Sequence, residues 1–127
     1  MDQDLKVFNY QPIQPEKLSV DELFMKRLIV IVENHLADSN FDLEVLCNEM
    51  GMRYLQLYRK VKAITNLSLK QFILTLRMKT AEKLLETGKF TISEVAFDVG
   101  FTSPAYFSEK FKKHFGTTPS EYIRMLK

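Results

Sequence analysis

The chain has 127 residues, enough for one domain or two very small ones, and its hydrophobic content of 46% argues against wholesale disorder. A single cysteine, Cys47, excludes an internal disulfide framework and favours a reducing compartment. The net charge of +2 is unevenly distributed: residues 1–52 hold 4 Lys+Arg against 10 Asp+Glu, whereas residues 53–127 hold 14 against 6. The basic second part indicates an anionic partner such as nucleic acid, and an ordinary solvated surface is the alternative.

The first nineteen residues contain Pro12 and Pro15 and show no sustained periodicity, so we expect a linker or arm at 1–19. The opening stretch MDQDLKVFNY is acidic and lacks the apolar core of a signal peptide. The longest aliphatic run, residues 28–32, is too short to span a bilayer. These features predict a soluble, cytoplasmic protein.

Beyond this arm the pattern predicts an all-α fold of seven helices, because no β-branched run alternates with polar residues. Three hydroxyl residues, Ser19, Thr91 and Thr118, are followed by an acid three positions later, which is typical of a helix start. Gly88 and Gly116 follow helical patterns, as residues that close a helix do. The expected helices are roughly 20–37, 42–50, 53–65, 68–87, 91–99, 104–115 and 119–126.

An internal repeat organises these helices. At a shift of 49 residues, which becomes 50 after a one-residue insertion in the turn, apolar positions match apolar positions. The aligned pairs are Leu43 with Ile92, Leu46 with Val95, Cys47 with Ala96, Met50 with Val99, Gly51 with Gly100, Leu57 with Phe107, Val61 with Phe111, Lys62 with Lys112 and Phe72 with Tyr122. Each copy is a short helix, a Gly-containing turn and a second helix, which predicts a helix-turn-helix whose second helix enters a DNA major groove. A pair of purely structural helical hairpins is the alternative.

The two second helices are expected to have one inward and one outward face. At 100° per residue, Phe107, Phe111 and Phe115 share one side of helix 104–115, and Leu57 and Val61 take the same place in helix 53–65. The opposite sides carry Arg, Gln, Tyr and Lys, the residue types that contact base edges and phosphates. Duplicated helices with such outer faces favour DNA binding.

A long connecting helix is expected between the two copies. Residues 68–87 contain no internal Gly or Pro, and about nineteen residues at about 1.5 Å per residue span roughly 29 Å. One turn of B-DNA is about 34 Å, so this helix could hold two recognition helices in successive major grooves. The predicted organisation is an arm at 1–19, a first helix-turn-helix at 20–67, a connecting helix at 68–87 and a second helix-turn-helix at 88–127.

Short motifs in both copies form a family signature. They are Ile92-Ser-Glu-Val-Ala96, Val99-Gly-Phe101, Tyr106-Phe-Ser108, Phe111-Lys-Lys113, Phe115-Gly116 and Thr118-Pro119 in the second copy, with Gly51-Met52, Leu57-Tyr-Arg-Lys60 and Arg77 before it. Over about residues 20–127 the chain resembles the AraC-type (AraC/XylS) DNA-binding domain, in the style of the C-terminal domain of hybrid two-component regulators. The resemblance implies sequence-specific binding of double-stranded DNA, activation of transcription through RNA polymerase, and dimerisation through other parts of a longer parent.

The resemblance also implies which residues contact bases. They are Leu55, Gln56, Tyr58 and Arg59 in the first copy and Pro104, Ala105, Tyr106 and Glu109 in the second. The candidates for phosphate contact are Lys60, Lys62, Ser103, Lys110, Lys112 and Lys113. Arg59 is the strongest candidate base reader, since Arg binds guanine with two hydrogen bonds, and a surface salt bridge is its alternative role.

Several positions depart from the family pattern or leave two roles open. Arg53 stands where a Ser-type cap is usual, and Asn66 stands where Gly is usual. Glu109 replaces Arg or Lys, so it either accepts from cytosine N4 or pairs with a lysine one turn later, and we expect the second copy to bind more weakly or to read differently. Arg77 is equally suited to a structural role and to a phosphate contact.

No residue pattern points to catalysis, a cofactor or a metal. His35 and His114 are 79 positions apart and lack partners at ligand spacing, and Cys47 is expected in the core. There is no Gly-rich phosphate loop and no nucleophile motif, so an enzyme is not predicted. Two other binding functions remain as alternatives: a helical protein-interaction module, and an RNA binder that would favour single strands.

Overall fold

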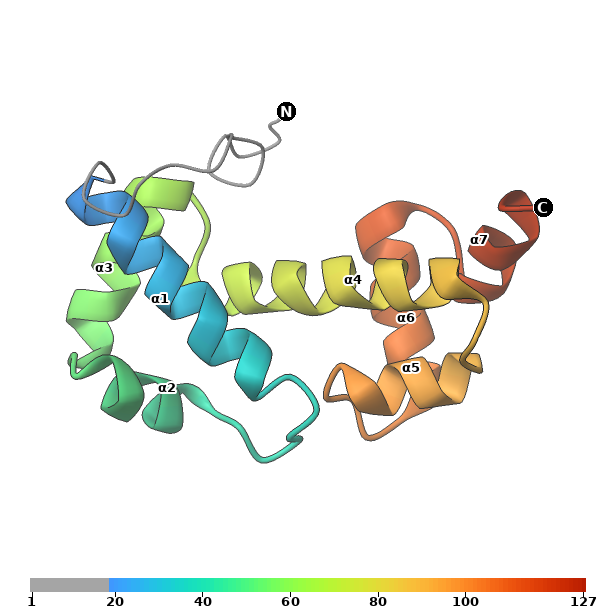
Figure 1. Ribbon diagram of the computed structural model, residues 1–127, viewed down its shortest axis with the longest axis horizontal. Helices are drawn as coiled ribbons and strands as arrows, with labels where there is room; N and C mark the ends of the chain where they lie inside the picture. The colour runs from blue at the N-terminus through green and yellow to red at the C-terminus, as the bar shows by residue number, and fades with distance from the viewer. Residues whose placement is uncertain (1–18) are drawn as a thin grey trace.

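The computed structural model describes residues 19–127, so the predicted arm lies outside the described residues except for Ser19. This part of the chain is built from seven helices and contains no strand (Figure 1). The helices are α1 (Val20–Asn34), α2 (Leu43–Met50), α3 (Tyr54–Thr65), α4 (Leu69–Thr87), α5 (Ile92–Asp98), α6 (Pro104–Phe115) and α7 (Pro119–Met125). The predicted all-α fold is confirmed.

Helix starts follow the capping chemistry of the sequence. Ser19 Oγ accepts from the Glu22 N–H at 3.1 Å while Glu22 Oε1 accepts from the Ser19 N–H at 2.9 Å, and Thr91 and Thr118 form the same reciprocal pair with the acid three residues on. Such a box satisfies two backbone donors that the helix itself leaves free. The three predicted capping boxes are therefore confirmed.

The first helix ends earlier than predicted, at Asn34 instead of about 37. The His35 N–H bonds to Val32 O at 3.0 Å, a tightened final turn, and the chain then bends away. Leu36 is nevertheless buried in the core, so its place in the apolar pattern reflects burial after the helix has ended. Periodicity alone cannot separate these two cases.

The fold has two hydrophobic cores, and α4 contributes to both. The first core is formed with α1, α2 and α3, which we call the first unit, and the second with α5, α6 and α7, which we call the second unit. Leu69, Phe72 and Leu76 belong to the first core, whereas later residues of α4, including Met78 and Leu85, belong to the second. The connecting helix is thus a structural element of both units.

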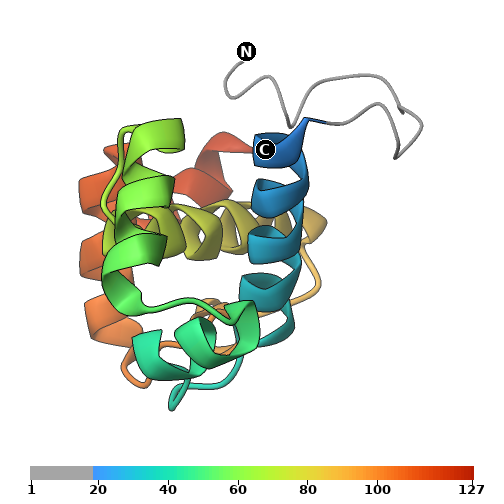
Figure 2. The ribbon, with the colours of Figure 1, turned by 90° about the vertical axis from the view of Figure 1, so that its left-hand side faces the viewer.

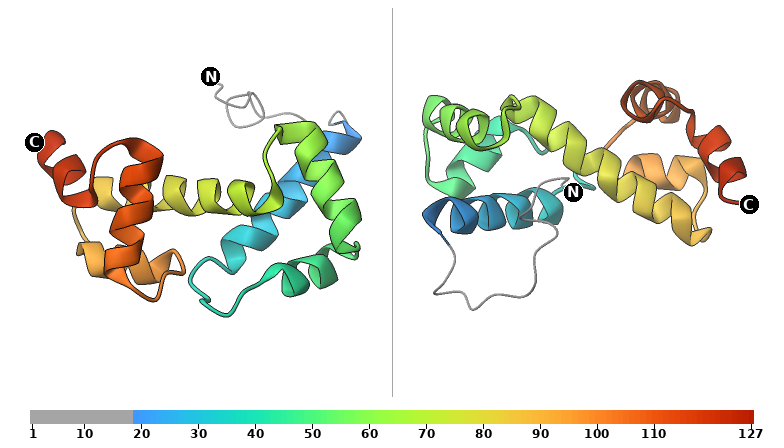
Figure 3. Two further views of the ribbon diagram at one scale, coloured as in Figure 1. Left: turned by 180° about the vertical axis from the view of Figure 1, so that it is seen from behind. Right: turned by 90° about the horizontal axis from the view of Figure 1, so that it is seen from above.

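The two units lie at opposite ends of α4, and their second helices lie on the same side of it. Seen along α4, both α3 and α6 are on the left and α1 is on the right (Figure 2). The views from behind and from above agree, with α3 and α6 on one side of α4 and α1 on the other (Figure 3). One face of the molecule therefore presents both helices.

Candidate nucleic-acid interface

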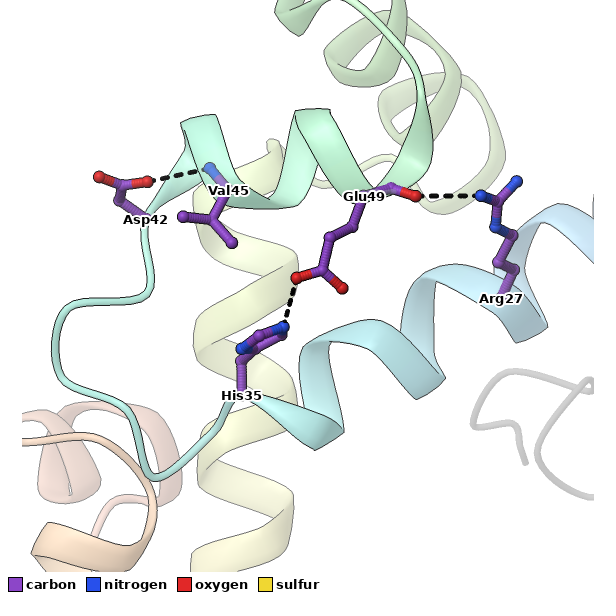
Figure 4. A network of polar contacts seen from close by, with 5 residues as sticks. All are labelled: Arg27, His35, Asp42, Val45 and Glu49. Carbon is purple, nitrogen blue, oxygen red and sulfur yellow. Dashed lines mark hydrogen bonds and ion pairs between the residues drawn. The ribbon is translucent and has the colours of Figure 1, made fainter.

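Polar contacts between α1 and α2 hold the first helix-turn-helix in place (Figure 4). Arg27 Nη2 donates to Glu49 O at 3.0 Å, and His35 Nε2 lies 2.6 Å from Glu49 Oε2. At the other end of α2, Asp42 Oδ1 accepts from the Val45 N–H at 3.0 Å and caps the helix. The two contacts of Glu49 fix the end of α2 from which the chain turns into α3.

The two copies of the repeat superpose in burial as well as in sequence. Leu57 and Phe107 are fully buried, and so are Val61 and Phe111 one turn later. The chain enters each second helix through a glycine with positive φ, +67° at Gly51 and +92° at Gly100. Because most other residues are strained at positive φ, this backbone conformation explains why glycine stands at both matched positions.

The first recognition helix starts without the usual side-chain cap. Arg53 occupies the cap position, and its guanidinium has no acceptor, so it cannot bind a free backbone N–H of the first turn. Only the reverse contact is made, in which Gln56 Oε1 accepts from the Arg53 N–H at 3.2 Å. In α6 the equivalent Ser103 Oγ does accept, from the Tyr106 N–H at 3.2 Å.

Arg53→Ser is therefore expected to stabilise the chain. A serine can accept from the first turn of α3, which raises the free energy of unfolding by about 1 kcal/mol, and Ser103→Ala should lower it by a similar amount. Urea denaturation followed by circular dichroism measures both. Stability that stays unchanged in Arg53→Ser would show that the Gln56 contact already suffices.

The outer face of α3 carries the predicted first-copy contacts. Leu55 is 53% exposed, and Gln56 and Arg59 are also exposed, whereas Tyr58 is half-buried. Tyr54 was not predicted as a site residue, yet it is 46% exposed and its ring lies 6.0 Å from that of Tyr58. The repeat contained a signal for it, because Tyr54 is the counterpart of the predicted Pro104.

The outer face of α6 carries Glu109 where that of α3 carries Arg59. Ala105 and Glu109 are exposed, Tyr106 is 51% exposed and Pro104 is half-buried. The Tyr106 ring lies 5.9 Å from that of Phe101, which supports it from the turn. Within residues 19–127 Glu109 forms no ion pair, so the predicted pairing with Lys112 or Lys113 is not observed.

The predicted phosphate contacts fall into two groups. Lys62, Lys112 and Lys113 are exposed, and Lys62 Nζ donates to Asn66 O at 3.2 Å, where Asn66 ends α3 with a φ of +65°. Lys60 and its counterpart Lys110 are half-buried.

Lys60 and Lys110 both make contacts within the chain. Lys60 Nζ lies 3.7 Å from Asp21 Oδ1 and 5.0 Å from the centre of the Phe24 ring, so it faces α1. Lys110 Nζ lies 5.4 Å from the centre of the Tyr106 ring. A phosphate contact by Lys60 would have to compete with its contacts to α1.

Arg77, whose role the sequence left open, and Cys47, which was expected in the core, both take part in packing. The Arg77 guanidinium donates to the carbonyls of Leu36 and Val99, a structural role, and burial lowers its pKa. Cys47 is half-buried at the edge of the first core, where burial raises the pKa of its thiol. In the described part of the chain no cluster of three His, Cys, Asp or Glu is placed to bind a metal, and no helix is long and apolar enough to cross a membrane.

Comparison with known sequences places this arrangement in a family. A family described as a helix-turn-helix domain matches residues 46–125. Histidine kinase P4 of Formosa agariphila is 41% identical over 120 residues, which are 92% of this chain and 9% of that protein. The arabinose operon regulatory protein of Escherichia coli is 36% identical over 94 residues, 72% of this chain and 31% of that protein. The chain thus spans less than a third of either relative.

Solved structures agree with the sequence comparison. The C-terminal domain of AraT, a response regulator from Geobacillus stearothermophilus, superposes with a TM-score of 0.74 at 28% identity, covering 86% of this chain and 88% of that one. The DNA-binding domain of AdpA, a global transcriptional factor solved in complex with a target DNA, superposes with a TM-score of 0.72 at 27% identity, covering 80% and 90%. The chain belongs to the helix-turn-helix family of AraC-type DNA-binding domains.

Proposed function

We propose that this module reads one DNA duplex with α3 and α6 placed in successive major grooves. The observation that supports it most directly is the position of both helices on one side of the molecule, at opposite ends of α4 (Figure 3). α4 has 19 residues, so it is roughly 29 Å long, close to the roughly 34 Å of one helical turn of B-DNA.

Base readout is assigned to the outer faces of the two helices. Arg59 suits the O6 and N7 of guanine, and Leu55 and Ala105 suit the methyl group of thymine. Gln56 suits adenine, but reading a base requires its amide oxygen to leave the Arg53 N–H. The remaining proposed base contacts are Tyr58, Pro104, Tyr106 and Glu109.

The second unit should read differently from the first. Glu109 is exposed and forms no ion pair within the described residues, so its carboxylate is available to accept from cytosine N4. The same negative charge repels nearby phosphates, which weakens the contribution of α6 to overall affinity. Preference for a C·G pair in the half-site of α6 is the signature of this role.

Phosphate neutralisation is assigned first to the exposed lysines Lys62, Lys112 and Lys113, and then to the half-buried Lys60, Lys110 and Ser103. Lys112→Ala should reduce the slope of log K against log salt by about one unit or less, because one fewer counterion is released. Fluorescence anisotropy with a duplex at several salt concentrations measures this slope.

Lys26→Ala is the matched control for that measurement. Lys26 is also exposed and its removal changes the net charge equally, but α1 lies on the side of α4 away from α3 and α6 (Figure 3). Its slope should stay close to that of the wild type. The same slope for Lys112→Ala and the wild type would remove Lys112 from the proposed phosphate contacts.

In its parent protein the module would activate transcription by contacting RNA polymerase, with pairing of two copies supplied by other segments. The small share of the relatives that the chain spans, 9% and 31%, supports such a modular parent. The C-terminal position named for the similar domain of the response regulator AraT is consistent with it.

A selection experiment tests the proposal as a whole. Duplexes bound from a random library should converge on two half-sites about one helical turn apart, and binding should fall steeply with salt. A protein-interaction module would bind duplex DNA weakly and select no sequence. An RNA binder would prefer single-stranded RNA in the same salt titration.

A further inference from the structure

Arg77, in the middle of α4, lies where the two units meet. Leu76 belongs to the first core and Met78 to the second, and Arg77 lies between them in the sequence. The two cores share no buried residue, so packing alone leaves each unit attached to its own end of a common helix. Direct contacts between the units therefore matter for their relative orientation.

Arg77 makes such a connection with a single nitrogen. Its Nη1 donates to Leu36 O of the first unit at 3.0 Å and also to Val99 O of the second unit. Leu36 follows α1, and Val99 ends α5, so the two carbonyls come from segments 63 positions apart in the sequence. Half-burial shields these charge-assisted hydrogen bonds from water, which strengthens them.

Gly100 shows how closely the units approach at this point. A Cβ atom placed on Gly100 would lie 1.7 Å from Arg77 Nη1 and 2.3 Å from Leu36 O, distances that no side chain can occupy. Its repeat counterpart Gly51 has a similar positive φ, but nothing lies within 4 Å of a Cβ placed there. Gly100 is therefore required for a second reason, because any side chain there would occupy the space in which Arg77 contacts Leu36 O.

We propose that Arg77 is a positioning residue that sets the orientation of α6 relative to α3 and thereby the spacing between the two DNA half-sites. The inference rests on the proposed function, since it assumes that both helices read one duplex. When α3 and α6 are held rigidly, binding of the second half-site becomes intramolecular. This raises affinity only where the distance between the DNA half-sites matches that between the helices. Without the Arg77 bridge, the units are expected to change orientation about α4 and to accept altered spacings.

The first test compares duplexes that differ only in spacing. Duplexes selected by the wild type are remade with one or two base pairs inserted or removed between the half-sites. The affinity ratio between native and altered spacing should fall roughly tenfold in Arg77→Met, because a shared donor to both units is lost. Affinity losses of equal size at every spacing would show that Arg77 only stabilises the fold, and would overturn the proposal.

The glycines provide a matched pair of variants. Gly100→Ala and Gly51→Ala both place a side chain in the left-handed region, so both strain the backbone. Only Gly100→Ala places a methyl group against Arg77 and the Leu36 carbonyl that it binds, so only that variant should lose spacing preference. Equal behaviour of the two variants would count against the bridge.

A measurement without DNA separates this inference from the proposed function. Nitroxide labels at Ala63→Cys and Lys113→Cys, which are repeat counterparts exposed on α3 and α6, report the distance between the two helices in a Cys47→Ala background. Pulsed electron paramagnetic resonance should give one narrow distribution of label distances for the protein with Arg77 and a broader or shifted one for Arg77→Met. An unchanged distance distribution in Arg77→Met would overturn the positioning role. A changed distribution, together with no spacing preference of the wild type for DNA, would reject the proposed reading of two grooves and leave the positioning role standing.

Discussion

Arg59→Ala is expected to remove most of the discrimination between the selected duplex and a scrambled one. Arg59 is exposed on α3, and across residues 19–127 it forms no ion pair, so the alternative role in a surface salt bridge is not observed. An Arg bound to guanine through two hydrogen bonds contributes about 1–3 kcal/mol of discrimination, roughly a 5- to 150-fold ratio. Binding to scrambled DNA depends mainly on phosphates and should change little.

Lys62→Ala is the matched control for this prediction, because it removes one positive charge from the same helix. Its loss of affinity should be similar on the selected and scrambled duplexes, since a phosphate contact carries no sequence information. Anisotropy titrations of both variants on both duplexes, at one salt concentration, give the four ratios. Equal losses on the two duplexes for Arg59→Ala would exclude it as a base reader.

Phe111→Ala is expected to unfold the second unit while the first remains folded. Phe111 is fully buried, and its ring centre lies 4.6 Å from that of Phe115, 5.8 Å from that of Phe107 and 5.8 Å from that of Tyr122. Truncating a buried Phe costs about 3–5 kcal/mol, a large share of the roughly 5–15 kcal/mol that stabilises a whole domain. Because the second core is separate, this cost falls on α5, α6 and α7.

Native-state hydrogen exchange locates the effect, since it reports the stability of each segment. Amides of α5–α7 should lose protection in Phe111→Ala while those of α1–α3 keep it. Val61→Ala, the repeat counterpart, should give a smaller loss confined to the first unit, because fewer atoms are removed. Equal loss of protection in both units would mean that α4 couples them into one cooperative structure.

Most helix starts and ends were predictable because their causes are local, whereas the end of α1 was placed too late. A capping box joins residues three positions apart, such as Thr91 and Glu94, and a left-handed cap depends on one residue, such as Gly88 or Asn66. The inward faces of α3 and α6 followed from periodicity, as the burial of Leu57 and Phe107 confirms. Each of these features depends on residues within about one helical turn, which a single sequence displays directly.

The amino-acid sequence by itself thus determined the helices, the duplicated motif and the residue types on its outer faces. Only the tertiary structure decided that α3 and α6 lie on one side of α4 (Figures 2 and 3). It also decided that Lys60 faces Asp21 of α1 and that Arg77 joins Leu36 to Val99. The physical reason is distance along the chain, because these contacts join segments that meet only when both cores have packed against the common helix.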